Sequence, residues 1–117
     1  MEELVGQIHL LCQDQNGCRY LQKKLEEENS VNIDLIFVEV SAHFVELMID
    51  PFGNYLCQKL LEYCSEEQRD TLIDTISPKL VDIALDVHGT RAVQKMIDYL
   101  AQNQTLKPVI ELVLFRK

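Results

Sequence analysis

The chain has 117 residues, of which 47% are apolar and 26% are charged, a balance typical of one soluble globular domain. The formal net charge of −8 argues against nonspecific nucleic-acid binding, although a local basic strip is compatible with that total. The four cysteines lack the C-x-x-C spacing of zinc and redox motifs, so we interpret them as small core residues in a reducing cytosol. No apolar run approaches the ~20 residues that span a membrane, so no membrane partner is expected.

Three segments of the sequence align without gaps, and each begins 36 residues after the previous one. They are "DQNGCRYLQKKLEEE" from residue 14, "DPFGNYLCQKLLEYC" from residue 50 and "DVHGTRAVQKMIDYL" from residue 86. Asp, Gly, Gln and Lys coincide in all three segments, and an acid recurs at Glu26, Glu62 and Asp98. This period indicates a repeat protein whose stacked units share one core.

Helix signals follow one another along the chain. "VNIDLIFVEV", residues 31–40, is rich in β-branched residues and by itself favours a strand. Its aligned partner, residues 67–76, has a helical pattern, so we predict a helix for both. Asp50 and Ser65 are expected to cap the next two helices, and Ser77 followed by Pro78 predicts a further helix start.

We therefore predict an all-α fold, a single α-solenoid over residues 1–117 with about three helices per unit. The predicted units are residues 1–29, 30–65 and 66–104, followed by a partial fourth unit or capping helix at 105–117. The apolar stretch "VIELVLF", residues 109–115, would leave the terminal repeat exposed and favours self-association.

The middle segment places three polar side chains at one helix start. On a helical wheel, Leu56 and Leu60 fall on the core side, whereas Asn54, Tyr55 and Gln58 fall on the opposite, exposed side. Asn54 and Gln58 are four residues apart, so their amides point the same way beside the Tyr55 ring. We interpret the preceding Gly as leaving room for a flat group to approach.

The other two segments repeat this arrangement. Cys18 and Gln22 flank Arg19 in the first, and Thr90 and Gln94 flank Arg91 in the third. Amide-type groups can bind the edge of a base while a planar side chain stacks on its face, which is how single-stranded RNA is recognised. The lysines that follow each Gln are predicted phosphate contacts: Lys23, Lys59 and Lys95.

On these segments the sequence resembles the Pumilio (PUF) family of RNA-binding repeat proteins, over about residues 1–105. The resemblance implies a right-handed α-solenoid of three-helix repeats that binds RNA without cofactor, metal or catalysis. It implies an adenine reader at Cys18 and Gln22, a uracil reader at Asn54 and Gln58, and a second adenine reader at Gln94. Thr90 stands where the family more commonly has Ser or Cys. Because the family binds RNA antiparallel to the protein, the expected preference is 5′-AUA-3′.

The resemblance also implies a cytoplasmic role at mRNA 3′ untranslated regions, in translational repression or decay, with protein regulators of mRNA decay as partners. The alternative from the residues is a helical scaffold that binds protein, in the manner of armadillo or HEAT arrays. An enzyme is not indicated, because no Ser/His/Asp arrangement, phosphate loop or HExxH motif is present and the three histidines do not cluster in the sequence.

Overall fold

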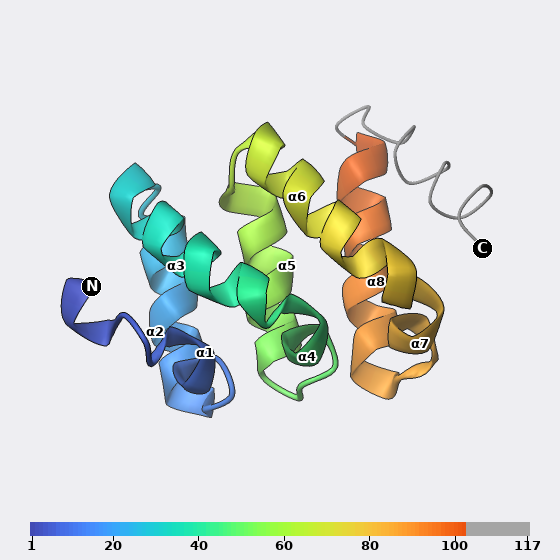
Figure 1. The fold of residues 1–117 in the computed structure, drawn as a ribbon, viewed down its shortest axis with the longest axis horizontal. Coiled ribbons are helices and arrows are strands. Elements are labelled where there is room, and N and C mark those ends of the chain that lie inside the picture. Colours follow the sequence, from blue (N-terminus) through green and yellow to red (C-terminus); the bar gives the residue numbers. More distant parts are fainter. Residues whose placement is uncertain (103–117) are drawn as a thin grey trace.

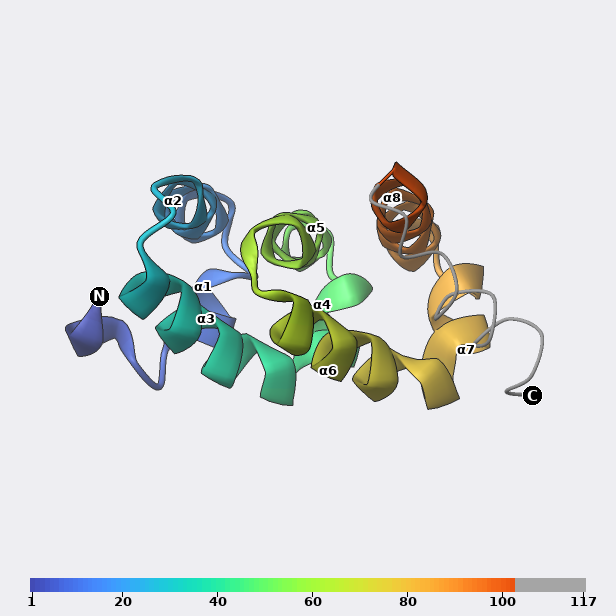
Figure 2. The same ribbon diagram turned by 90° about the horizontal axis from the view of Figure 1, so that it is seen from above.

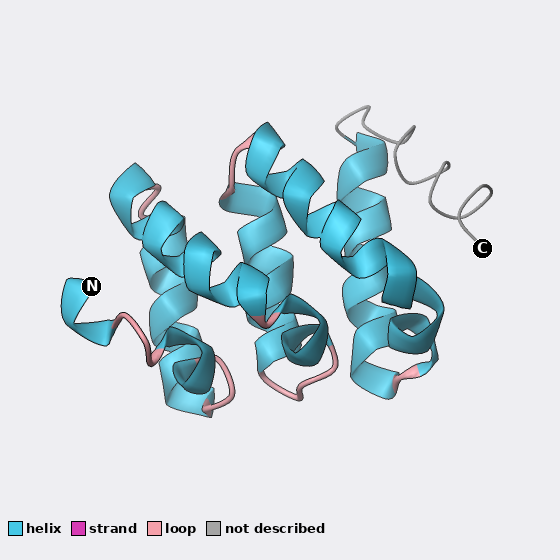
Figure 3. Cartoon of the chain, in the orientation of Figure 1, coloured by secondary structure: helices cyan, strands magenta, loops and turns pink. Residues whose placement is uncertain are grey.

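The computed structural model describes residues 1–102, and every regular element in this range is helical (Figures 1 and 3). The elements are η1 (Glu2–Leu4), α1 (Ile8–Leu11), α2 (Gln15–Glu26), α3 (Ser30–Ala42), α4 (Phe44–Met48), α5 (Gly53–Tyr63), α6 (Glu66–Ile76), η2 (Ser77–Lys79), α7 (Leu80–Leu85) and α8 (Val87–Gln102). The all-α prediction is confirmed, whereas the predicted fourth unit at 105–117 lies outside the described residues. Among residues 1–102, no helix has both the length and the apolar character that a bilayer crossing requires.

The helices are arranged as a solenoid with two layers (Figure 2). The α2–α5–α8 row forms one layer, in which α2 packs on α5 and α5 packs on α8. The α3–α6 row forms the other layer, and the short helices α1, α4 and α7 lead into the long helices of the first row. The 36-residue period of the sequence therefore becomes the step from one long helix to the next.

Apolar side chains from both rows and from the short helices form one continuous core. Phe44 of α4, Leu21 of α2, Leu56 of α5 and Leu72 of α6 are all essentially fully buried. Each such side chain contributes roughly 1.5–3 kcal/mol when it leaves water. Because these four residues come from different helices, no unit buries its apolar face alone, and adjacent units stabilise one another.

The segment 31–40 is helical, as its repeat partner predicted and against its own β-branched composition. It lies within α3, whose buried residues Ile33, Ile36 and Val40 recur at helical spacing and face the core. The side chain of Asn29 caps the helix by accepting a hydrogen bond from the Asn32 amide at 3.1 Å. Packing of this face against neighbouring helices outweighs the weak strand preference of Val and Ile.

An aspartate caps the start of each long helix in the α2–α5–α8 row. The carboxylates accept hydrogen bonds from the backbone amides of the glycines three residues later: Asp14 from Gly17 at 2.8 Å, Asp50 from Gly53 at 2.7 Å and Asp86 from Gly89 at 2.9 Å. The bond from Gly89 holds the pKa of the Asp86 carboxyl below its usual range. The recurring D-x-x-G pattern is therefore a helix start, as expected.

The recurring glycine has a steric reason that the sequence did not reveal. A Cβ atom at these positions would lie against a carbonyl oxygen of the preceding short helix: 2.6 Å from Leu11 at Gly17, 2.9 Å from Leu47 at Gly53 and 2.1 Å from Ile83 at Gly89. The space beside each glycine is thus filled by the chain's own backbone. The interpretation that this space admits a flat group is wrong.

The two predicted serine caps have different outcomes. Ser65 caps α6 in a capping box, in which its hydroxyl accepts from the Gln68 amide and the Gln68 side chain accepts from the Ser65 amide. A helix does begin at Ser77, since the 3₁₀ helix η2 starts there with Pro78 in its first turn and leads into α7, but the expected cap by the Ser77 side chain is absent. Ser77 has helical backbone angles, whereas an N-cap residue needs an extended backbone, and its hydroxyl donates back to the Asp74 carbonyl.

We expect Gly89→Ala to destabilise the chain by about 1–3 kcal/mol, because the added methyl group would clash with the Ile83 backbone carbonyl, which cannot move without shifting α7. This cost exceeds the gain of about 1 kcal/mol that Ala normally brings to a helix. The measurement is urea unfolding followed by circular dichroism. The control is Thr90→Ala at the exposed neighbouring position, expected within about 0.5 kcal/mol of the unsubstituted chain. Equal midpoints for the two variants would contradict the steric account.

Candidate nucleic-acid interface

The candidate site is the side of the α2–α5–α8 row that faces away from the α3–α6 row. The three predicted stacking residues, Arg19, Tyr55 and Arg91, are exposed and lie near the starts of their three helices. Each helix start carries the same aspartate–glycine hydrogen bond, and the helices pack side by side (Figure 2). The fold therefore brings together the polar residues that the sequence places 36 residues apart.

In the first unit a buried thiol holds the glutamine. Gln22 Nε2 donates to Cys18 Sγ at 3.2 Å, and Cys18 Sγ donates to the Phe52 carbonyl at 3.2 Å. Cys18 is only 2% exposed, whereas Gln22 is half-buried. Cys18 therefore links the first unit to the second and orients the amide of Gln22.

In the second unit the amide of Asn54 holds Gln58, as the thiol of Cys18 holds Gln22 in the first. Gln58 Nε2 donates to Asn54 Oδ1 at 3.2 Å, while Asn54 Nδ2 donates to the carbonyls of Asp50 at 2.8 Å and Pro51 at 3.0 Å. Asn54 is fully buried, so its predicted place on the exposed helix side is wrong. Its counterpart in the first unit, Cys18, is buried in the same way. Gln58 is the amide that reaches the surface.

The third unit departs from the first two. Thr90 and Gln94 are both exposed, and Gln94 Nε2 donates to Asp98 Oδ1 at 3.1 Å rather than to Thr90. The amide of Gln94 is therefore turned toward the C-terminal half of α8, whereas those of Gln22 and Gln58 are turned toward the helix starts.

A slot opens between the first and second units. It is a cavity of about 320 Å³ whose walls include Arg19 from α2 and Tyr55 from α5, with Cys18 and Gln22 also lining it. No hydrogen bond or ring contact joins Arg19 to Tyr55 within residues 1–102. The slot thus presents a guanidinium plane, an aromatic ring and an amide to one space, which suits a flat heterocycle.

The matching space between the second and third units is closed. Arg91 Nη1 donates to the Tyr55 hydroxyl at 2.7 Å, and the Arg91 guanidinium carbon lies 5.8 Å from the centre of the Tyr55 ring. Tyr55 therefore has one open face, toward Arg19, and one face covered by Arg91.

The three predicted phosphate contacts have different surroundings. Lys59 Nζ lies 3.2 Å from Glu26 Oε2, and this hydrogen bond raises the pKa of the Lys59 ammonium group. Lys23 is exposed and Lys95 lines a cavity of about 300 Å³, and neither forms an ion pair with another described residue. The lysines are therefore not equivalent, although the sequence repeats them exactly in register.

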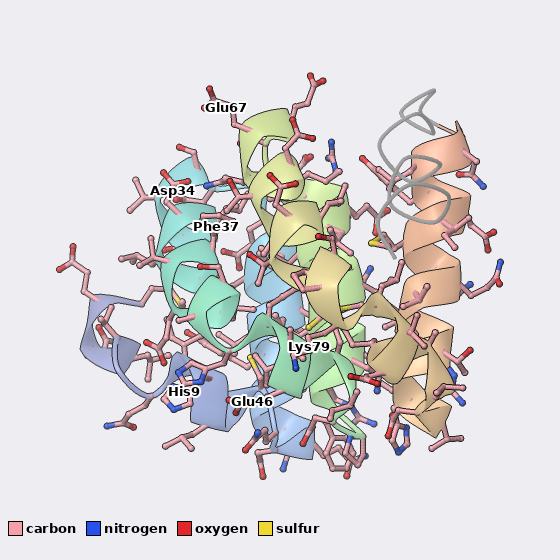
Figure 4. All side chains as sticks on the ribbon, turned by 45° about the vertical axis from the view of Figure 1, so that its right-hand side comes forward. His9, Asp34, Phe37, Glu46, Glu67 and Lys79 are labelled. Carbon is pink, nitrogen blue, oxygen red and sulfur yellow. The ribbon has the colours of Figure 1, made fainter. Side chains whose placement is uncertain are left out.

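Charge is divided between the two rows. The long helices α2, α5 and α8 carry most basic residues of the described chain: Arg19, Lys23, Lys24, Lys59, Arg91 and Lys95. The same three helices also carry the acids Glu26, Glu62 and Asp98, and the other row adds exposed carboxylates such as Asp34 on α3 and Glu67 on α6 (Figure 4). The overall negative charge is thus compatible with a locally basic face.

The structure also brings together two histidines that are distant in sequence. The His9 and His43 rings stack with centroids 4.1 Å apart, and His9 Nδ1 contacts Glu39 Oε2 at 2.6 Å. Burial opposes ionisation of Glu39, but hydrogen bonds from His9 and from the Gly6 amide hold its carboxyl pKa below the usual range. These contacts anchor the N-terminal segment to α3. At the 36-residue period Glu39 aligns with Glu3 and Thr75, and this alignment did not signal the contact with His9.

The four cysteines are buried and free, as predicted. Burial raises the pKa of the Cys12 thiol to about 12 and that of Cys64 to about 11. No group of His, Cys, Asp and Glu side chains within residues 1–102 is arranged to hold a metal ion. The side chains of the site are amides, guanidiniums, lysines, one phenol ring, the Cys18 thiol and the Thr90 hydroxyl.

Comparison with known proteins assigns the chain to a family. Residues 7–41, 43–77 and 79–114 match the model of the Pumilio-family RNA binding repeat. The three matches start 36 residues apart, and each contains one of the D-x-x-G helix starts. Since the matches cover most of the sequence, the chain belongs to the Pumilio family.

Individual relatives match over part of the chain. Putative pumilio homolog 7, chloroplastic, of Arabidopsis thaliana is 55% identical over 64 residues, which cover 55% of this chain and 10% of that protein. A Pumilio domain-containing protein of Schizosaccharomyces pombe is 56% identical over 59 residues, which cover 50% of this chain and 8% of that protein. The matches thus span about a tenth of the length of these curated relatives.

Solved structures share the fold over nearly the whole chain. The Puf3 RNA binding domain bound to a Cox17 RNA 3′ UTR recognition sequence aligns with a TM-score of 0.83 and 32% identity, covering 97% of this chain and 33% of that one. The RNA-binding domain of yeast Puf5p bound to MFA2 RNA aligns with a TM-score of 0.79 and 41% identity, covering 92% and 28%. The chain spans about a third of these arrays, and the solenoid prediction is confirmed.

We expect Cys18 to behave as a neutral, protected thiol in the folded protein. Burial raises its pKa, which keeps the thiolate fraction low at pH 8, and only the thiolate is the nucleophile. Alkylation by iodoacetamide at pH 8 should be about tenfold or more slower in the native chain than in urea. Mass spectrometry of the alkylated peptides checks this. Rapid native labelling of Cys18 would contradict the buried contact with Phe52.

Proposed function

We propose that this chain reads single-stranded RNA with the exposed side of the α2–α5–α8 row, one base per repeat. The observation that carries the proposal is the parallel support of Gln22 and Gln58. Each donates at 3.2 Å to a buried side chain one turn earlier, and each lies beside an exposed planar residue. A scaffold for protein ligands has no need for the same oriented amide at successive repeats.

The slot between Arg19 and Tyr55 supports the proposal with a space of suitable chemistry. An unpaired base inserted there would be sandwiched between a guanidinium plane and an aromatic ring, with the Gln22 amide at its edge. Base stacking of this kind contributes roughly 1–3 kcal/mol per base. Three bases, less the cost of ordering the strand, correspond to roughly micromolar to millimolar affinity for this chain alone.

The proposed preference is 5′-AUA-3′, with the strand antiparallel to the protein. Cys18 and Gln22 would bind an adenine edge, Asn54 and Gln58 a uracil edge, and Thr90 and Gln94 an adenine edge. Because Asn54 is buried, it acts on the base chiefly by fixing the amide of Gln58. Lys23 is the lysine best placed to contact a phosphate, since it is exposed and carries no ion pair within the described chain.

The proposed biological role follows from the family and from the named ligands of the solved relatives. Puf3 is bound to a 3′ UTR recognition sequence in its structure, which supports a similar class of target here. We propose that the protein containing this chain binds mRNA 3′ untranslated regions in the cytoplasm and represses translation or promotes decay with protein regulators. The proposed role is binding and not catalysis.

We expect a short RNA carrying AUA to bind more tightly than the same RNA carrying ACA. Uracil and cytosine present opposite donors and acceptors at their edges, and an amide held in one orientation discriminates between them by about 1–3 kcal/mol, or roughly 5- to 150-fold. Fluorescence anisotropy with labelled RNA at high micromolar protein measures the two affinities.

The matched variants for this experiment are Gln58→Ala and Gln7→Ala. Gln58→Ala removes the oriented amide, so the two RNAs should bind it about equally, whereas Gln7→Ala at an exposed position before α1 should keep the discrimination. Equal affinity of the unsubstituted chain for both RNAs, or no binding to either, would refute the proposed reading.

Tyr55 should contribute to binding through its ring and not through its hydroxyl. Tyr55→Ala removes a stacking surface, so we expect RNA affinity to fall by about 5- to 150-fold. Tyr55→Phe keeps the ring and releases Arg91, so we expect affinity to stay the same or to rise up to about fivefold. Similar losses in both variants would show that the hydroxyl itself binds RNA.

A further inference from the structure

The outer side of α3 carries apolar residues where α6, the matching helix of the next unit, carries polar ones. Val31, Leu35 and Val38 lie on α3 at helical spacing. Their exposed counterparts on α6, 36 residues later, are Glu67, Thr71 and Asp74. The helix α3 therefore has a second apolar side besides the one that faces the core, and this second side adds to the strand-like composition of residues 31–40.

This second apolar side is open to solvent. Val31 is 61% exposed and Val38 is 68% exposed, while Leu35 is half-buried. A helix that is apolar on all sides is normally buried on all sides, because each apolar side chain gains free energy by leaving water. The outer side of α3 is thus an apolar surface that residues 1–102 leave uncovered.

A groove lies along this side of α3. It is a cavity of about 420 Å³, within the range of roughly 300–1,000 Å³ that is typical of ligand pockets in proteins. Its walls include Leu35 and Val38 from α3 and Val5 from the segment that precedes α1. Apolar side chains of a ligand would therefore meet apolar walls from two different segments of the chain.

Contacts within the chain hold the groove in shape. The rings of His9 and His43, which also line it, stack with their centroids 4.1 Å apart. The carboxylate of Glu39 accepts hydrogen bonds from the backbone amides of Gly6 and His9, which fixes the N-terminal segment against α3. The walls are thus in place before a ligand binds, so binding need not order them.

The surroundings of the groove are acidic. The elements η1, α1, α3 and α4 contain no Lys or Arg. Asp34 lies one turn from Val38 on α3, and Glu46 of α4 lies 3.9 Å from His43 Nδ1 (Figure 4). Both carboxylates are exposed, as is that of Glu2 on η1. These charges would repel the phosphates of RNA and the anionic surface of a membrane, whereas they would attract an apolar protein segment that carries Lys or Arg.

The same charges disfavour a second copy of this chain as the occupant. In a twofold dimer one surface meets the identical surface of its partner. The carboxylates of Asp34 and Glu46 would then face carboxylates, and like charges across an interface oppose association.

We propose that this groove binds a short segment of another protein, in which two apolar side chains are flanked by Lys or Arg. The apolar side chains would pack on Leu35 and Val38, and the basic ones would lie near Asp34 and Glu46. The α3–α6 row lies on the opposite side of the solenoid from the candidate RNA site, so the two ligands would not compete (Figure 2). This inference goes beyond the proposed RNA reading and does not rest on it.

The chain itself supplies a matched variant for the test. The triple variant Val31→Glu, Leu35→Thr, Val38→Asp gives the outer side of α3 the residues that α6 carries in the same register. Because α6 is helical with these residues, α3 should stay helical, which circular dichroism checks. The single variant Val38→Ser changes one exposed position, where substitutions have small effects on stability.

The probe is a library of random peptides displayed on phage. Phage that bind the triple variant are removed first, which discards peptides held by negative charge alone, and the rest are selected on the unsubstituted chain. The selected peptides should carry two apolar side chains flanked by Lys or Arg. A fluorescently labelled synthetic copy of one of them then serves for affinity measurements by anisotropy.

The variants should weaken binding of this peptide to different extents. We expect a loss of about tenfold or more in the triple variant and about three- to tenfold in Val38→Ser, because apolar contacts are removed. Glu46→Gln should weaken binding by about two- to fivefold, since it removes one exposed charge partner. The control is Val81→Ser on α7, a position that is 71% exposed and lies outside the groove, and it should leave the affinity unchanged.

The outcomes decide between the possible occupants. Failure to enrich any peptide, enrichment of acidic peptides, or equal affinity of the Val38→Ser and Val81→Ser variants overturns the proposal. A dimer of the unsubstituted chain that the triple variant loses, measured by sedimentation equilibrium, shows that a second copy covers the groove and overturns it as well. Peptide binding that disappears when the chain is joined to further repeats of its array shows that a repeat covers the groove, with the same consequence. Basic-flanked peptides that lose affinity in Val38→Ser and in Glu46→Gln support the proposal.

Discussion

The close approach of a backbone carbonyl to a glycine, made at the start of each long helix, is the contact on which the rest of the structure depends. Any residue larger than Gly at position 17, 53 or 89 would push away the short helix that precedes it. The capping aspartate three residues earlier fixes where the long helix begins. Together they fix how each short helix joins its own long helix, a junction that recurs in all three units.

Because the three long helices begin alike, their polar side chains emerge in register, but their partners differ. Gln22 and Gln58 are held by buried side chains of the same turn, whereas Gln94 turns to Asp98. Tyr55 is shared between two interfaces and is free on one side and covered by Arg91 on the other. The repeated sequence thus gives two different interfaces: the space between Arg19 and Tyr55 is open, whereas the space between Tyr55 and Arg91 is closed by their hydrogen bond.

Internal repetition made most of the fold predictable. It identified residues 31–40 as helix against their own composition, because their aligned partner has a clear helical pattern. It did not predict the burial or the hydrogen bonds of a residue where these depend on neighbours outside its own helix. Asn54 is buried, as is its counterpart Cys18, and its amide donates to the Asp50 and Pro51 carbonyls. Ser77 begins the 3₁₀ helix η2 but has helical backbone angles and does not cap it.

The sequence by itself determined the period, the helix starts and the residue types offered to a ligand, since these depend on local backbone preference and on spacing along one helix. Only the tertiary structure decided which of these residues remain available. Lys23, Lys59 and Lys95 are identical in register, yet Lys59 alone of the three is paired with a carboxylate from the previous unit. The reason is that such pairing needs a partner side chain from a neighbouring unit, and the packing between units is not determined by the spacing of residues along one helix.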